Sequence, residues 1–214
     1  MKALPENLAP QSVLKTIPNL LIIFRFFAAF VLLKMAWDGH VDGSFTVIFI
    51  LAVISDIIDG MIARRFGGVT AWLREADSRA DLCLYICVAL SLWRVYPQIW
   101  LAFELPLLAL IGSQILHWLA SLLKYGRLAS YHSYSAKFWG LTLAIATVAL
   151  FGFGYAGWTL GLAIVTGILH NLEEIVMTLL LPEWSYDVVS LQKAWQLRSQ
   201  QLTTVKAQVK TPIA

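Results

Sequence analysis

The chain has 214 residues, of which 59% are hydrophobic and only 14% are charged, and its mean hydropathy is +0.71. This composition excludes an ordinary soluble domain and indicates an integral membrane protein. The net charge of +3 is too small to indicate a nucleic-acid-binding protein. The two cysteines, Cys83 and Cys87, lie in an apolar run without further zinc ligands nearby, so we expect reduced thiols.

Six apolar segments follow one another along the chain, and we expect each to be a transmembrane helix. Residues 1–15 precede them and favour a short N-terminal interfacial helix. We predict that Pro106 kinks the fourth helix, and that the polar tail at residues 183–214 contains an amphipathic helix around residues 187–198. The expected fold is therefore all-α, with a six-helix transmembrane domain at residues 16–182. The spans are expected at about residues 17–37, 45–64, 77–95, 99–123, 138–153 and 158–181.

The sixteen Lys and Arg residues are distributed unevenly between the two sides of this arrangement. Most of them lie on the side that holds both termini, the connection between the second and third spans, and the loop between the fourth and fifth. The opposite side holds only Lys34 and Arg94. The positive-inside rule then predicts that both termini and the second connection face the cytoplasm.

Four aspartates lie where the second span ends and the third begins. Asp56 and Asp59 are three residues apart, and Asp77 and Asp81 are four apart, so each pair shares one face of its helix. Carboxylates beside apolar spans are costly without a cation, and their oxygens are ligands that Mg²⁺, Mn²⁺ and Ca²⁺ prefer. We therefore predict that the two helices face each other around a divalent-metal site. Arg64 and Arg65 follow at a place where the phosphates of a metal-bridged substrate would lie.

Other polar residues occur inside the apolar spans. Arg25 lies about 12 Å into the first span, which is far for a side chain to reach the interface, so we favour a functional role. His117 in the fourth span is expected to be a packed, hydrogen-bonded histidine. A further group in the sixth span is compatible either with interhelical hydrogen bonds or with a pocket for a substrate, and it comprises His170, Asn171, Glu173 and Glu174.

The aspartates and their neighbours form a motif with fixed spacing. In order it reads Asp56-x2-Asp59-Gly60-x2-Ala63-Arg64, then eight residues, then Leu73-x3-Asp77-x3-Asp81. This motif closely resembles the signature of the CDP-alcohol phosphotransferase family, D-x2-D-G-x2-A-R-x8-G-x3-D-x3-D. Two departures stand out: Leu73 replaces the second glycine, and Ile22 occupies a position in the first span where the family often has threonine. The segment at residues 17–21, followed by Arg25, also resembles the start of the family's first span.

The resemblance implies a transferase of phospholipid biosynthesis. Such an enzyme moves a phosphatidyl or other phosphoalcohol group from a CDP-linked donor to an acceptor alcohol and releases CMP. The donor it favours is CDP-diacylglycerol, and the acceptor is a small polar alcohol or alcohol phosphate. The resemblance also implies a homodimer surrounded by membrane lipids, with residues 16–182 as the catalytic domain. The distribution of Lys and Arg predicts that the active site faces the cytoplasm.

Roles for individual residues follow from the same resemblance. Asp56, Asp59 and Asp77 would ligate one or two Mg²⁺ or Mn²⁺ ions. Asp81 would contact a metal and act as the catalytic base toward the acceptor hydroxyl. The remaining residues would bind the donor: Gly60 and Ala63 would let the nucleotide approach the second helix, Arg64 would contact the nucleotide, and Arg25 would reach a phosphate.

Two other functions use intramembrane carboxylates. A membrane prenyltransferase also binds a diphosphate through Mg²⁺ and aspartates, but its motifs usually occur twice, and this sequence has one cluster. A divalent-cation carrier would need polar residues that continue to the far side of the membrane. The outer halves of the second and third spans are nearly uniformly apolar, which favours the transferase.

Overall fold

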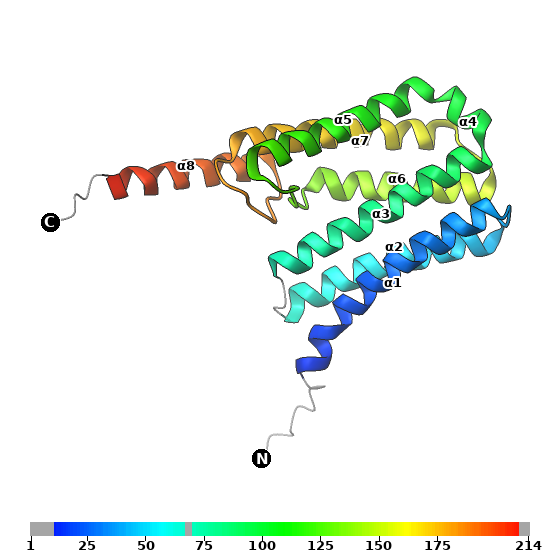
Figure 1. The fold of residues 1–214 in the computed structure, drawn as a ribbon, viewed down its shortest axis with the longest axis horizontal. Helices are drawn as coiled ribbons and strands as arrows, with labels where there is room; N and C mark the ends of the chain where they lie inside the picture. The colour runs from blue at the N-terminus through cyan, green and yellow to red at the C-terminus, as the bar shows by residue number, and fades with distance from the viewer. Residues whose placement is uncertain (1–10, 67–69, 210–214) are drawn as a thin grey trace, which may run out of the picture. The chain divides into compact units, whose positions relative to one another are not determined.

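The computed structural model describes residues 11–66 and 70–209, with the side chains of residues 17–62, 70 and 72–200. This part of the chain folds into helices and contains no strand (Figure 1). The helices are α1 (Gln11–Trp37), α2 (Gly43–Phe66), α3 (Ala71–Val95), α4 (Pro97–Ala102), α5 (Glu104–Tyr125), α6 (Tyr134–Phe153), α7 (Gly157–Leu180) and α8 (Leu191–Val209).

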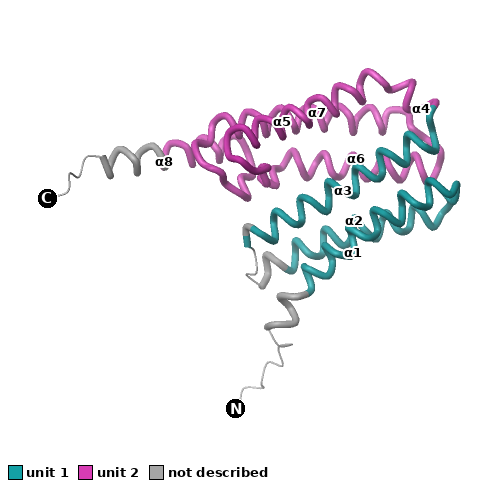
Figure 2. The backbone as a smooth tube through the Cα atoms, in the orientation of Figure 1, with its two compact units in different colours: residues 1–97 teal, residues 98–214 magenta. Residues whose placement is uncertain are grey.

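The chain forms two compact units, residues 1–97 and residues 98–214 (Figure 2). In the first unit, α1 packs against both α2 and α3. Small buried side chains at Ala28, Ala29, Ala52 and Ala80 let these helices approach closely, as is common where helices pack inside a membrane. This close approach brings the polar residues of three helices together.

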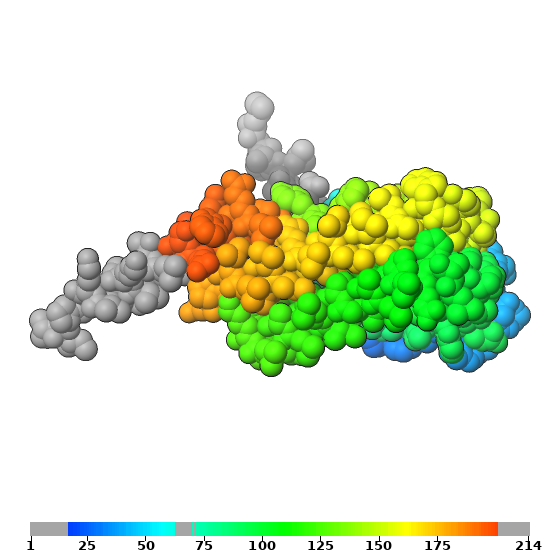
Figure 3. Space-filling model, turned by 90° about the horizontal axis from the view of Figure 1, so that it is seen from above, coloured from blue at the N-terminus to red at the C-terminus, as the bar shows by residue number. Residues whose placement is uncertain are grey.

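In the second unit, α7 is the central helix and packs against α5 and α6. Figure 3 shows the side chains of α5 and α7 side by side along one face of this unit. The Lys124 ammonium at the end of α5 lies 2.9 Å from the carbonyl oxygens of Thr178 and Leu179, so it donates to the last turn of α7. Helix α8 packs on the same end of α7, where Ala194 joins a buried cluster with Met177 and Leu181.

The expectation of an all-α integral membrane protein is confirmed. Among the described helices, five are long and apolar enough to cross a membrane, and many of their large apolar side chains are exposed as lipid-facing residues would be. Helix α3 has 25 residues, but its first half carries charges that include Asp77, Arg79 and Asp81. The sixth span therefore remains a prediction. The five candidates are Ile17–Trp37, Gly43–Ile62, Glu104–Tyr125, Tyr134–Phe153 and Gly157–Leu180.

The fourth expected span differs from the structure. Instead of one helix kinked at Pro106, the chain forms α4 and α5 with a break at Phe103. Pro106 has no N–H to donate to the carbonyl oxygen of Ala102, four residues earlier, and α4 ends at that residue. Pro106 itself lies in the first turn of α5, where a missing N–H costs no bond.

The two ends of the described chain also differ from expectation. Helix α1 already begins at Gln11, so the expected interfacial segment at residues 1–15 overlaps its start, and residues 1–10 lie outside the described residues. The helix in the tail begins at Leu191 rather than near residue 187. Asp187 has a φ of +54°, outside the right-handed helical region, whereas the Ser190 hydroxyl accepts a bond from the Lys193 amide at 3.3 Å and caps the helix.

Candidate active site

The candidate site lies in the first unit, where α1, α2 and α3 pack together. Thr70 sets the start of α3, because its hydroxyl accepts a hydrogen bond from the Leu73 amide at 3.1 Å and caps the helix. The helical repeat then places Asp77 and Asp81 on one face, four residues apart. Asp56 and Asp59 come from the second half of α2.

Three of the four aspartates are spaced as ligands of one ion would be. One carboxylate oxygen from each of Asp56, Asp59 and Asp77 lies within 4.8 Å of the other two. Oxygen ligands lie about 2.1 Å from Mg²⁺ and somewhat further from larger hard cations, so small adjustments would let these oxygens share an ion. The donor set also fits, because it consists of carboxylate oxygens alone.

Arg25 of α1 contacts all four aspartates. Its Nη1 atom lies 2.8 Å from Asp77 Oδ1, 2.5 Å from Asp81 Oδ1 and 3.2 Å from Asp56 Oδ1, while Nη2 donates to Asp59. The arginine side chain is fully buried. A planar guanidinium can reach several carboxylates because its N–H groups point in fixed, divergent directions. The structure thus brings the two aspartate pairs together around a single cation from a third helix.

A small pocket opens beside this cluster. Its charged lining residues are Asp59, Asp77 and Arg74, and Gly60 also lines it. The two residues that depart from the family pattern, Ile22 and Leu73, both line it. The complete lining consists of Pro18, Ile22, Asp59, Gly60, Leu73, Arg74 and Asp77.

The family model that describes the CDP-alcohol phosphatidyltransferases matches residues 15–180 of this chain. The chain belongs to the CDP-alcohol phosphatidyltransferase family. The match covers Arg25, all four aspartates and the greater part of the second unit. Searches found no matching curated protein and no matching solved structure. Family membership supports transfer of a phosphoalcohol group from a CDP-alcohol in phospholipid synthesis, and the family is dependent on divalent metal.

Two of the site residues expected from the sequence cannot be placed in the pocket. The side chains of Ala63 and Arg64 lie outside the described residues, although the backbone of both is part of α2. Gly60 does line the pocket. The roles expected for these three residues, for the four aspartates and for Arg25 remain predictions.

The structure adds residues that the motif does not contain. Arg74 and Pro18 line the pocket, and neither was predicted as a site residue from the sequence. The position of Arg74 three residues before Asp77 was the available signal, because residues three apart share a helix face. The ion pairs of Arg25 had no comparable signal, since its partners are 31 or more residues away along the chain.

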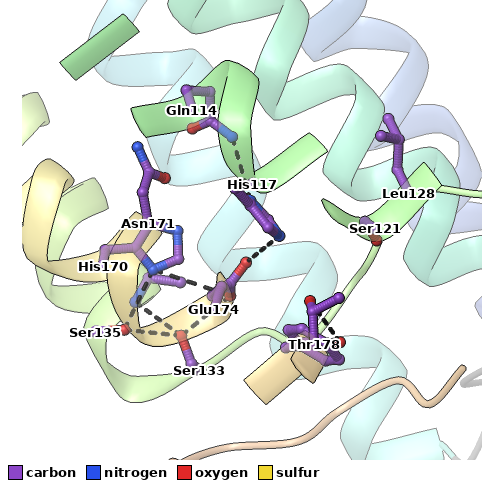
Figure 4. Close-up of polar contacts among 12 residues, drawn as sticks. Gln114, His117, Ser121, Leu128, Ser133, Ser135, His170, Asn171, Glu174 and Thr178 are labelled. Atoms are coloured by element: carbon purple, nitrogen blue, oxygen red, sulfur yellow. Dashed lines mark hydrogen bonds and ion pairs between the residues drawn. The ribbon is translucent and has the colours of Figure 1, made fainter. Parts of the chain in front are cut away.

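A second polar cluster is buried among α5, α6 and α7 of the second unit (Figure 4). The Glu174 carboxylate lies between two histidines: Oε2 is 3.4 Å from His117 Nε2, and Oε1 is 3.9 Å from His170 Nδ1. The Ser133 hydroxyl, at the start of α6, donates to Glu174 Oε1 at 3.2 Å. Asn171 of α7 donates to the Ser113 hydroxyl of α5 at 2.9 Å.

These contacts favour one of the two interpretations of the polar residues in the last span. His170, Asn171 and Glu174 all contact residues of neighbouring helices, so they act as interhelical hydrogen-bonding groups. His117 is packed and buried, as expected, with its Nδ1 atom 3.4 Å from the Gln114 amide nitrogen. Glu173 is only partly buried and lies beside this network.

Proposed function

We propose that this protein is a metal-dependent phosphatidyltransferase that uses CDP-diacylglycerol as the donor and a small polar alcohol or alcohol phosphate as the acceptor. The observation that carries the proposal is the convergence of Asp56, Asp59, Asp77 and Asp81 in a chain of this family. Carboxylates gathered beside a lipid phase suit a reaction in which a lipid diphosphate must be held by cations.

The proposed reaction is a displacement at phosphorus. The acceptor hydroxyl oxygen forms a bond to the phosphorus that carries the lipid, and the bond from that phosphorus to the oxygen of CMP breaks. Asp81 takes the proton of the hydroxyl as the new bond forms. Bound Mg²⁺ or Mn²⁺ offsets the charge of the diphosphate and of the departing CMP.

The exposure of the aspartates supports this division of roles. The side chains of Asp59 and Asp77 are 5% and 12% exposed, which suits ligands that hold an ion. The side chain of Asp81 is 34% exposed, so an acceptor hydroxyl can approach it. Asp56 is also accessible, but its oxygen belongs to the triad that fits an ion.

The pocket beside the aspartates is the proposed place of the donor headgroup. Gly60 gives close access to α2, whereas Ile22 and Leu73 add an apolar wall. The acyl chains of the donor would remain in the bilayer against the exposed apolar faces of the helices. We further propose that the active site faces the cytoplasm, from the distribution of Lys and Arg, and that the protein is a homodimer, from the family resemblance.

The test is a reaction with purified protein in lipid nanodiscs. Labelled CDP-diacylglycerol is supplied with Mg²⁺ or Mn²⁺ and with each member of a panel of alcohols and alcohol phosphates. We expect release of CMP together with one labelled phospholipid, and no release when the metal is chelated. No CMP release with any acceptor in a broad panel would refute the proposal, and uptake of Mn²⁺ into proteoliposomes without nucleotide would support a carrier instead.

A further inference from the structure

The guanidinium of Arg25 lies among the same oxygens that the proposed metal would use. Asp56 and Asp77 belong to the triad that fits an ion, and Nη1 contacts an Oδ1 atom of each. The third member of the triad, Asp59, receives the bond from Nη2. Every carboxylate suited to the ion is therefore already paired with one arginine.

We propose that Arg25 is an internal counter-cation that holds the four aspartates together when no divalent ion is bound and competes with the ion for their oxygens. This inference rests on the proposed metal-dependent function. It makes Arg25 a positioning residue that sets the affinity for metal, in addition to the role toward phosphate that the family resemblance implies.

The charges show why such a cation is needed. Four carboxylates packed at the edge of apolar helices repel one another, and water can reach Asp59 and Asp77 only slightly. The fully buried guanidinium offsets one of the four charges, donates hydrogen bonds to Asp59, Asp77 and Asp81, and forms an ion pair with Asp56. Without it or a metal ion, the ends of α2 and α3 would be pushed apart.

The same contacts explain the competition. An ion bound to Asp56, Asp59 and Asp77 would lie within a few ångströms of the guanidinium, where two cations repel each other strongly. Each carboxylate has two oxygens, so one carboxylate can contact both the ion and the arginine. Arg25 cannot, however, keep all four of its present contacts when the ion is bound. Binding of the ion therefore requires Arg25 to give up part of its pairing.

The experiment compares Arg25→Gln, Arg25→Lys and a control, Arg79→Gln, in nanodiscs without nucleotide. The control removes the same charge from an exposed side chain of α3 that pairs with Glu75 at 2.6 Å. Mn²⁺ affinity is measured by titration calorimetry, and the melting temperature is measured in chelator and in saturating Mn²⁺.

We expect Arg25→Gln to melt at a lower temperature than the wild type in chelator, yet to bind Mn²⁺ at least about tenfold more tightly because one adjacent positive charge is removed. Its gain in melting temperature from Mn²⁺ should be the largest of the set. Arg25→Lys should be intermediate, because an ammonium keeps the charge but lacks the fork that reaches four carboxylates. Arg79→Gln should resemble the wild type in both measurements.

Weaker or unchanged Mn²⁺ binding by Arg25→Gln would overturn the inference, as would a lack of Mn²⁺ binding by both proteins. If Arg25→Gln does not fold, a structure of the wild type with Mn²⁺ tests the inference instead. Retention of all four Arg25 contacts in that structure would refute competition. Loss of the Nη1 contact with Asp77 would support it. CMP release is scored separately. Absent turnover with tighter Mn²⁺ binding would refute the proposed function and leave this inference standing.

Discussion

Among single residues, Asp81 has a proposed role in the chemical step, and its replacement should affect turnover far more than the binding of metal or donor. Asp81→Asn keeps the size of the side chain but removes the base, so we expect kcat to fall by a factor of about 10² or more. The affinity for Mn²⁺ and for donor should change much less, because Asp56, Asp59 and Asp77 remain. The measurements are steady-state CMP release and Mn²⁺ titration.

The control for this substitution is Asp42→Asn, in an exposed turn where Asp42 accepts bonds from Ser44. It should leave turnover unchanged. If Asp81→Asn retains wild-type kcat, Asp81 is not the base. If instead its Mn²⁺ affinity collapses while turnover is restored at high Mn²⁺, Asp81 is mainly a ligand.

Replacement of Leu73 should affect both donor binding and stability, because Leu73 is buried and lines the pocket beside Gly60. Leu73→Ala should enlarge the space open to the donor and lower KM for CDP-diacylglycerol. It should also lower the free energy of unfolding by about 2–5 kcal/mol, the usual range for a buried leucine. Donor-dependent CMP release and thermal unfolding measure the two effects.

Leu84→Ala is the matched control for Leu73→Ala. Leu84 is buried on the same helix but does not line the pocket. The Leu84→Ala variant should lose a similar amount of stability, with no change in KM for CDP-diacylglycerol. Equal KM values for both variants would show that Leu73 does not restrict the donor.

At the level of helices, Glu174 connects three of them through side chains. Glu174→Ala removes the acceptor of the Ser133 hydroxyl and the group between His117 and His170. We expect the free energy of unfolding to fall by about 1–3 kcal/mol, since buried polar groups lose their partner. Thermal unfolding in detergent measures this loss.

Glu173→Ala serves as the control, because the neighbouring Glu173 is only partly buried. It should change the melting temperature much less. If both variants lose equal stability, the buried network does not stabilise this unit. A melting temperature of Glu174→Ala equal to that of the wild type would contradict the prediction outright.

The helices and the aspartate cluster were largely predictable from sequence, for different reasons. Apolar segments of bilayer length predict helices well, and the spacing of Asp56 to Asp59 and of Asp77 to Asp81 fixes which faces they share. The break at Phe103 was missed because the residues on both sides of it are apolar apart from Glu104. The partners of Arg25 and Glu174 depend on which helices pack together, and a single sequence does not encode that directly.

For the whole molecule, the topology depends on whether α3 crosses the membrane, and we predict that it does. Its apolar second half suits a span, whereas the charges in its first half surround the candidate site. With six spans, both ends of the chain lie on the same side, as the distribution of Lys and Arg predicts. With five, they lie on opposite sides.

Single cysteines distinguish these topologies in a background in which Cys83 and Cys87 are replaced. His40→Cys and Glu183→Cys each place a thiol at an exposed position between two helices, and Gln98→Cys places one at an exposed position in the first turn of α4. Sealed vesicles that expose the non-cytoplasmic face of the membrane are treated from the outside with a membrane-impermeant maleimide. Six spans with a cytoplasmic site predict labelling at His40→Cys and Gln98→Cys, and labelling of Glu183→Cys only after the membrane is opened. Labelling of Glu183→Cys but not of Gln98→Cys would mean that α3 does not cross, and the carboxylate site would then belong to a helix lying at the membrane surface.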